Sequence, residues 1–251
     1  MPWTKTEATL AAVLVDDLRS RGWSVYQEVE ALGAVADIVA TQGSCLWVIE
    51  AKVSLGVGVL SQARRWIGQA NLVSCAVAPG RTSDARRFAL DAAGAFGIGV
   101  LEVHRPEAAP AGERPASGEW HKRWTSYGLV SGPAIEVVRP TFTRRSGGRV
   151  RAALREEQKT YAQAGNADGK RYTAFTATCD AIRRELEFAD HPLVVSELVG
   201  RLRGNHHYAS EASARGAIRK WVEAGKIEGV ELEHRGRPHP TRVRLVGNVS
   251  A

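Results

Sequence analysis

Two β-rich runs, residues 34–41 and 45–53, are separated only by a short polar turn, and this spacing most constrains the fold. Gly43-Ser44 is the turn between them. A two-residue connection favours a tight β-hairpin, and glycine at its first position suits a type II′ turn. The hairpin register then follows from the turn alone, with Val39 opposite Val48.

The same register gathers three charged side chains on one face of the predicted hairpin. Asp37 faces Glu50, and Lys52 follows two residues along the strand, opposite Val35. Opposed carboxylates would repel at about 5 Å, unless a cation lies between them. Oxygen ligands suit Mg²⁺ or Mn²⁺. The alternative is a sheet edge where Glu50 and Lys52 only face solvent, but their strand neighbours are apolar.

The elements around this hairpin predict an α/β fold with a mixed β-sheet flanked by helices. A helix is expected after the capping-box pattern Thr4-x-x-Glu7, with Gly22 as its stop. Strands are predicted at 23–29, 34–41, 45–53, 72–78 and 98–103, and further helices at 59–70 and 83–96.

Residues 4–104 resemble the PD-(D/E)XK superfamily of restriction-endonuclease-like nucleases. Asp37, twelve residues and then Glu50-Ala51-Lys52 match its D-x(n)-(D/E)-x-K pattern, although Ala36 stands where the family has proline. The resemblance implies that Asp37, Glu50 and the carbonyl of Ala51 hold Mg²⁺, with Mn²⁺ as a substitute. Lys52 would then stabilise negative charge on the phosphate or orient the attacking water.

Further site residues are implied by the two flanking helices. Glu7 resembles the additional acidic residue found on the first helix of many members, so it is a candidate ligand and catalytic residue besides a capping residue. Gln62-x-x-x-Trp66 resembles the Q-x-x-x-Y element of exonuclease-like members. Gln62 would orient substrate or Lys52, whereas Trp66 suits the core. Arg64 and Arg65 could contact phosphate or lie on a solvated helix face.

Charge is divided unevenly along the 251-residue chain. Residues 1–104 carry 9 basic and 10 acidic side chains, whereas residues 105–251 carry 25 and 17. A basic second part predicts a nucleic-acid partner, with solubility alone as the alternative. No apolar run is long enough for a membrane helix, and three isolated cysteines indicate a reducing compartment. We therefore expect no membrane partner and a cytoplasmic, nucleoid-associated protein.

Residues 105–150 are predicted to be a Pro/Gly-rich basic linker. Within it, Trp120-His121-Lys122-Arg123-Trp124 and Tyr127 could stack on unpaired bases, although docking of these rings onto a domain is favoured. Arg144–Arg149 reads as a basic hinge.

Residues 151–251 have the pattern of a mainly α winged helix-turn-helix domain that binds DNA. Helices are expected at 150–163 and 173–188, from 196 to Gly204, and from the Ser210 cap to 224, with a hairpin after them. The helix 211–224 would be the recognition helix, and the hairpin tip the wing. The candidate DNA contacts are Arg215, Arg219 and Lys220 on the helix and Arg235 and Arg237 on the wing.

Together these features predict a metal-dependent DNA endonuclease: a catalytic domain at 1–104, a linker at 105–150 and a DNA-binding domain at 151–251. Duplex DNA is the expected partner, and cleavage of both strands would call for a homodimer. Two alternatives stay open. One is a DNA-binding regulator with a non-catalytic nuclease-like domain, and the other is a dimeric resolvase specific for junctions or branches.

Overall fold

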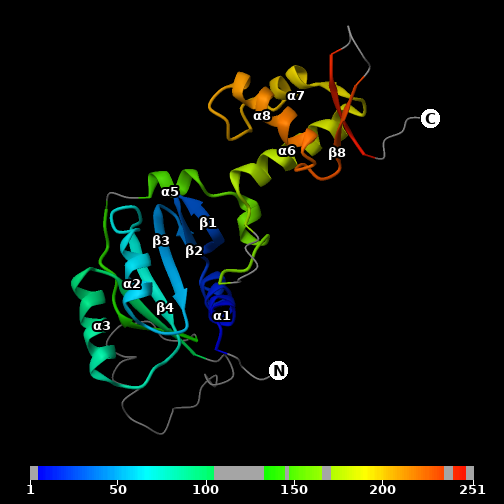
Figure 1. The fold of residues 1–251 in the computed structure, drawn as a ribbon. Helices are drawn as coiled ribbons and strands as arrows, with labels where there is room; N and C mark the ends of the chain where they lie inside the picture. Colours follow the sequence, from blue (N-terminus) through cyan, green and yellow to red (C-terminus); the bar gives the residue numbers. More distant parts are fainter. Residues whose placement is uncertain (1–4, 105–132, 145–146, 166–170, 235–239, 247–251) are drawn as a thin grey trace. The chain divides into compact units, whose positions relative to one another are not determined.

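The chain folds into two compact units, Met1–Arg171 and Tyr172–Ala251 (Figure 1). The structure is a computed structural model, and it describes residues 5–104, 133–144, 147–165, 171–234 and 240–246.

A six-stranded mixed sheet forms the centre of the first unit, with strand order β1-β2-β3-β4-β5-β6. β1, β2 and β3 form an antiparallel meander, β4 and β5 run parallel to β3, and β6 is antiparallel to β5. The predicted mixed sheet is thus confirmed. The strands are β1 (Ser24–Ala31), β2 (Ala34–Gln42), β3 (Cys45–Lys52), β4 (Leu72–Val77), β5 (Gly99–Val103) and β6 (Ala134–Val138).

Helices cover both faces of this sheet, as predicted. α1 (Glu7–Ser20) packs on one face through a core that includes Ile38 and Ile49. α2 (Val57–Arg64) and α3 (Asp84–Ala95) pack on the other face, where Val39 and Val48 belong to the core. Figure 1 shows α2 and α3 on the side of the sheet opposite α1. Alternation along β2 and β3 therefore directs Asp37 and Glu50 to the α2 face.

Two predicted helix boundaries in this unit are wrong. The N-cap of α1 is Thr6, which forms a capping box with Thr9, so Glu7 is the first helical residue and does not cap; Thr4 lies outside the described residues. α2 ends at Arg64 and does not reach residue 70. Gly68 has a φ of +76°, a left-handed conformation that helical backbone does not continue through.

The first unit extends well past the boundary predicted at residue 104. β6 lies inside the range predicted as linker, because its Ala-Ile-Glu-Val-Val run has enough β-branched residues to pair with β5. Past β6, the short helix α5 (Gly148–Ala152) buries Val150 against the α2-side core. The predicted helix 150–163 is wrong, since only α5 and the 3₁₀ turn η2 (Glu156–Lys159) form there. The aromatic-basic stretch 120–127 lies outside the described residues.

The second unit packs three helices against a three-stranded sheet of order β7-β9-β8. The predicted cap at Ser210 is confirmed, and Gly225, directly after the C-cap Ala224, has a φ of +64°. Its elements are α6 (Ala174–Ala189), β7 (Leu193–Val194), α7 (Val195–Arg201), α8 (Glu211–Glu223), β8 (Val230–Glu233) and β9 (Arg242–Leu245). Across the described part of the chain, no helix combines the length and the apolar character needed to cross a membrane.

Candidate active site

The β2–β3 hairpin has the predicted register. Val39 pairs with Val48, and Gln42 pairs with Cys45 across a two-residue turn. Gly43 has a φ of +57° and Ser44 has no positive φ, as in a type II′ turn. The backbone ladder reaches Ile38 and Ile49, and one step further would place Asp37 opposite Glu50.

Asp37 is not among the paired residues of the β2–β3 ladder, and it contacts β3 through its side chain instead. Its Oδ2 accepts a hydrogen bond of 2.8 Å from the backbone N–H of Ala51. This bond joins the carboxyl to β3 at the residue between Glu50 and Lys52. The two strands therefore hold Asp37 and the Glu50-Ala51-Lys52 segment together, as the sequence predicts.

Glu50 is almost completely buried, with 2% of its surface exposed. Its Oε1 accepts a hydrogen bond of 2.5 Å from the indole N–H of Trp66. Burial, and then the charge of Asp37, raise the pKa of Glu50 to about 8. Burial also raises the pKa of Asp37, although the Ala51 N–H and Lys52 oppose this effect. Glu50 therefore carries a proton near neutral pH in the absence of a cation.

Lys52 lies beside this pair and forms an ion pair with Glu7. Its Nζ is 2.6 Å from Oε2 of Glu7, and both side chains are about one-third exposed. Burial alone would lower the pKa of Lys52, but the hydrogen bond and charge of Glu7, together with Asp37 and Glu50, raise it. Because Thr6 caps the helix, the Glu7 carboxylate is free to reach across to the end of β3.

A further carboxylate, which is buried and which the sequence did not point out, lies next to Asp37. Glu28 is 7% exposed and occupies the β1 position between Gln27 and Val29, which pair with Ile38 and Ala36. Its φ is +53°, an uncommon conformation for a residue other than glycine. Burial raises the pKa of Glu28, and the charge of Asp37 adds to the rise. The available signal was the pair of adjacent polar residues Gln27 and Glu28 within the predicted strand 23–29.

Glu28 and Gln27 contact three residues near the C-terminal end of the first unit. The Gly165 N–H donates to Oε1 of Glu28 at 3.1 Å, and Arg171 Nε lies 3.4 Å from Oε2. The Ala164 N–H donates to Oε1 of Gln27 at 3.0 Å. Ala164, Gly165 and Arg171 were predicted to belong to the DNA-binding domain. They instead form part of the surroundings of the candidate site.

Gly165 also touches the first turn of α1. A Cβ on Gly165 would lie 2.7 Å from the carbonyl carbon of Glu7, and its φ is +73°. Gln163 Nε2 donates to the carbonyl of Ala8 at 3.2 Å. The connecting segment thereby fixes the backbone that carries Glu7, and through Glu7 it influences the position of Lys52.

α2 and the turn that follows it bring Gln62 and Trp66 to the carboxylate side of the sheet. Trp66 is buried, as predicted for a core residue, and it also bonds Glu50. The buried Oε1 of Gln62 has no hydrogen-bond partner among the described residues. Arg64 and Arg65 are exposed, and the Arg64 guanidinium lies 5.0 Å from the centre of the Phe96 ring. Roles for Gln62, Arg64 and Arg65 stay predictions.

The chemistry of the donors fits a divalent cation held by few protein ligands. Asp37 and Glu50 offer carboxylate oxygens at one place, and the pKa of Glu50 is raised first by burial and then by the charge of Asp37, two effects that a bound cation would oppose. In the described ranges no group of three or more His, Cys, Asp or Glu side chains is arranged to hold a metal. Glu7, engaged by Lys52, and the Ala51 carbonyl stay predicted ligands.

The predicted DNA-contact residues of the second unit lie on the exposed side of α8. Arg215, Arg219 and Lys220 are all exposed, while Ala214, Ile218 and Val222 face the core. Arg219 is paired with Glu223, with 3.0 Å between Nε and Oε1. Arg235 and Arg237 lie outside the described residues.

Known proteins provide neither a family nor a function for this site. Comparison with protein-family models, with curated proteins and with solved structures found no match for the chain.

Proposed function

We propose that the chain is a metal-dependent DNA endonuclease of the PD-(D/E)XK, restriction-endonuclease-like type. The observation that carries the proposal is the meeting of Asp37, Glu50 and Lys52 at one end of the β2–β3 hairpin, with Glu50 buried. Charged groups gathered among the apolar residues of two paired strands are typical of a functional site.

In this proposal Asp37 and Glu50 hold the cation, with the carbonyl of Ala51 as a further oxygen ligand. Bound Mg²⁺ or Mn²⁺ would polarise a phosphoryl oxygen of DNA and lower the pKa of a water molecule that attacks phosphorus. Glu50 would have to release its proton to bind the cation, and because its pKa is raised to about 8, this release is easier at slightly alkaline pH. Lys52, whose pKa the Glu7 carboxylate raises, would stabilise the negative charge that develops on the phosphate.

The second unit supports the DNA-binding half of the proposal. Its element order α6-β7-α7-α8-β8-β9 and its sheet order β7-β9-β8 support the proposal that this unit is a winged helix-turn-helix domain. α8 would be the recognition helix, and its exposed Arg215, Arg219 and Lys220 would meet DNA. The segment between β8 and β9, which contains Arg235 and Arg237, would be the wing.

A plasmid-nicking assay tests the catalytic half. Purified protein is incubated with supercoiled plasmid and Mg²⁺ or Mn²⁺, beside Asp37→Ala and Lys52→Ala variants. We expect metal-dependent nicking by the native protein and its loss in both variants. The matched control is Lys159→Ala, which removes another lysine ion pair, with Glu156 at 2.7 Å, in the same unit. Equal nicking by all proteins, or none by the native protein, would leave the DNA-binding regulator as the better reading.

The contact between Glu7 and Lys52 favours a second candidate, the resolvase. The resolvase hypothesis is supported by an acidic residue on the first helix beside the proposed catalytic lysine. The same assay on a four-way DNA junction and on its linear arms separates the two. Preferential cleavage of the junction, together with a dimer in light scattering, would favour the resolvase over the duplex endonuclease.

A further inference from the structure

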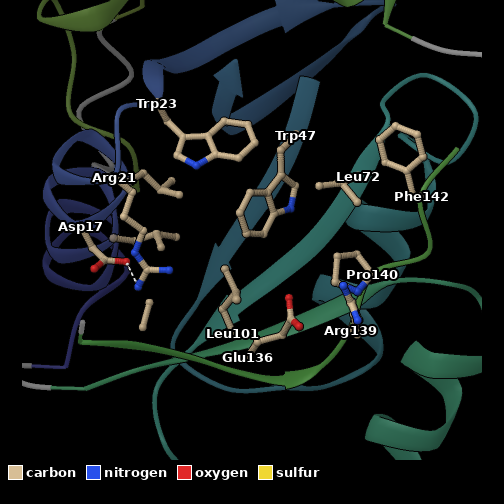
Figure 2. Close-up of a pocket in the computed structure, with 13 residues that line it drawn as sticks. Asp17, Arg21, Trp23, Trp47, Leu72, Leu101, Glu136, Arg139, Pro140 and Phe142 are labelled. Atoms are coloured by element: carbon tan, nitrogen blue, oxygen red, sulfur yellow. Dashed lines mark ion pairs between the residues drawn. The ribbon is translucent and has the colours of Figure 1, made fainter. Parts of the chain in front are cut away.

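A pocket of about 640 Å³ lies in the first unit on the α1 side of the sheet. It is formed by the C-terminal half of α1, one end of β3 and β4, and the strands β5 and β6 (Figure 2). Trp47 lines it and, by alternation along β3, lies on the face opposite Glu50. The pocket is therefore separate from the candidate active site, and its volume is in the range of small-molecule sites.

Aromatic rings form one side of the pocket. Trp23 and Trp47 meet edge to face with their ring centroids 5.6 Å apart, and Phe142 lies beyond them with 55% of its surface exposed. Figure 2 shows both indoles directed into the pocket. The Trp47 N–H already donates to Ser74 Oγ at 3.0 Å, so this ring offers a ligand its apolar surface. Such surfaces stack on planar heterocycles.

One acidic side chain points into the same space. Glu136, on β6, is half-buried and is directed toward the indoles in Figure 2. Among the described residues no hydrogen bond or ion pair to its carboxylate is found, although Arg139 is close enough to influence it. Burial raises the pKa of Glu136, as expected for a carboxylate short of donors. The other acid of the pocket, Asp17, is paired with Arg21 at 2.7 Å.

We infer that this pocket binds a planar heterocycle that presents a ring N–H beside an exocyclic amino group, as guanine does. A carboxylate can accept both of these hydrogen bonds at once, and Glu136 is placed to do so next to the rings that would stack on the base. Arg139 is exposed at the rim and could meet an anionic group attached to the heterocycle. Adenine presents a ring acceptor at the equivalent position and would repel the carboxylate.

Two sources share this chemistry: a free guanine nucleotide, and a guanine base of a single strand of DNA. The inference does not depend on the nuclease proposal, because no residue of the pocket belongs to the carboxylate pair. Asp37→Ala should abolish nicking and leave guanine binding unchanged, so the two proposals can fail separately.

The test is isothermal titration calorimetry of the full chain with GMP, AMP and IMP. We expect GMP to bind at least tenfold more tightly than AMP, with IMP intermediate because it keeps the ring N–H and lacks the amino group. Glu136→Gln should weaken GMP binding at least tenfold. Glu30→Gln, on the exposed side of β1, is the matched control and should bind GMP like the native protein.

Trp23→Leu provides a second variant that removes stacking surface without touching Glu136, and it should also weaken GMP binding. Two single-stranded DNA trinucleotides, one with a central guanine and one with a central adenine, identify the source. Tighter binding of the guanine trinucleotide than of GMP indicates a strand, and the reverse indicates a free nucleotide. Failure of both guanine ligands to bind at millimolar concentration, equal binding of GMP and AMP, or native-like binding by Glu136→Gln would overturn the inference.

Discussion

The indole N–H of Trp66 donates a hydrogen bond of 2.5 Å to the carboxyl of Glu50. Trp66 is placed there because α2 ends at Arg64. The chain then turns, and the backbone N–H of Trp66 donates a hydrogen bond to the carbonyl of Ala63. A continuous helix through residue 70 would have changed that orientation. The bond connects the α2 side of the core to the buried acid of the candidate site.

Trp66→Phe should shift the acidic limb of the nicking activity to higher pH. The bond from Trp66 lowers the pKa of Glu50, so its removal raises that pKa further, and more alkali is then required before Glu50 can bind the cation. Removing the bond should also reduce the free energy of unfolding by about 1–3 kcal/mol. The pH profile of nicking and urea unfolding measure the two effects.

Trp47→Phe is the control for this change. It removes another indole hydrogen bond, to Ser74, on the opposite face of the same sheet. We expect a similar loss of stability with an unchanged pH profile. If both variants shift the profile equally, the Trp66 bond has no specific effect on Glu50.

The stability of the metal-free protein should depend on the protonation of Glu50. Its pKa is about 8 in the folded protein and near 4.5 for an ordinary glutamate, so the folded state binds the proton more tightly. The stabilisation of the folded state by protonated Glu50 is therefore complete below about pH 4.5. It is lost as the pH rises to about 8, and the free energy of unfolding falls by up to about 1.4 kcal/mol per pH unit.

Urea unfolding in EDTA between pH 5 and pH 8 measures this slope. Glu50→Gln should have a smaller decline than the native protein over the same interval, because glutamine does not titrate. Identical slopes for the two proteins would mean that Glu50 is ionised throughout.

Glu7→Gln should move the alkaline limb of the nicking activity to lower pH. The carboxylate of Glu7 is a main cause of the raised pKa of Lys52, so its neutralisation lets Lys52 lose its proton earlier. The matched control is Glu156→Gln, whose partner is Lys159 in a comparable ion pair. An unchanged alkaline limb combined with a higher Mg²⁺ requirement would instead make Glu7 a metal ligand.

The hairpin that carries the site could be predicted because its determinants are local. Gly43-Ser44 sets the turn, the turn sets the register, and the register places Asp37 beside Glu50. The capping of α1 was harder to predict, because Thr4 and Thr6 compete for one role and sequence spacing alone does not choose between them.

Long-range pairing accounts for what the sequence did not predict. β6 pairs with β5 across a stretch rich in proline and glycine, and nothing local in Ala134–Val138 marks its partner. Glu28 becomes part of the site's surroundings only because Gly165, more than a hundred residues later, donates to it. Such interactions depend on tertiary structure and carry no periodic signal.

DNA binding by the second unit should depend more on Arg215 and Lys220 than on Arg219. Arg219 already pairs with Glu223, whereas in the described structure Arg215 and Lys220 have no ion pair. Removing a side chain that binds one phosphate should reduce the slope of log binding constant against log salt by about 0.9. Gel shifts of the full chain at several salt concentrations compare Arg215→Ala and Arg219→Ala. Arg184→Ala, exposed on α6, is the control and should match the native slope.

Gly165→Ala should impair both stability and nicking. A Cβ there would lie 2.7 Å from backbone atoms of Glu7, so the first turn of α1 must shift and take Glu7 away from Lys52.

Gly68→Ala isolates the backbone effect, because Gly68 has a similar φ of +76° with nothing within 4 Å of its Cβ. The backbone effect costs about 1–2 kcal/mol, so urea unfolding should show a larger loss for Gly165→Ala. Nicking should fall in Gly165→Ala and stay near native in Gly68→Ala. Equal losses of stability and activity in the two variants would mean that the segment at Gly165 does not position Glu7.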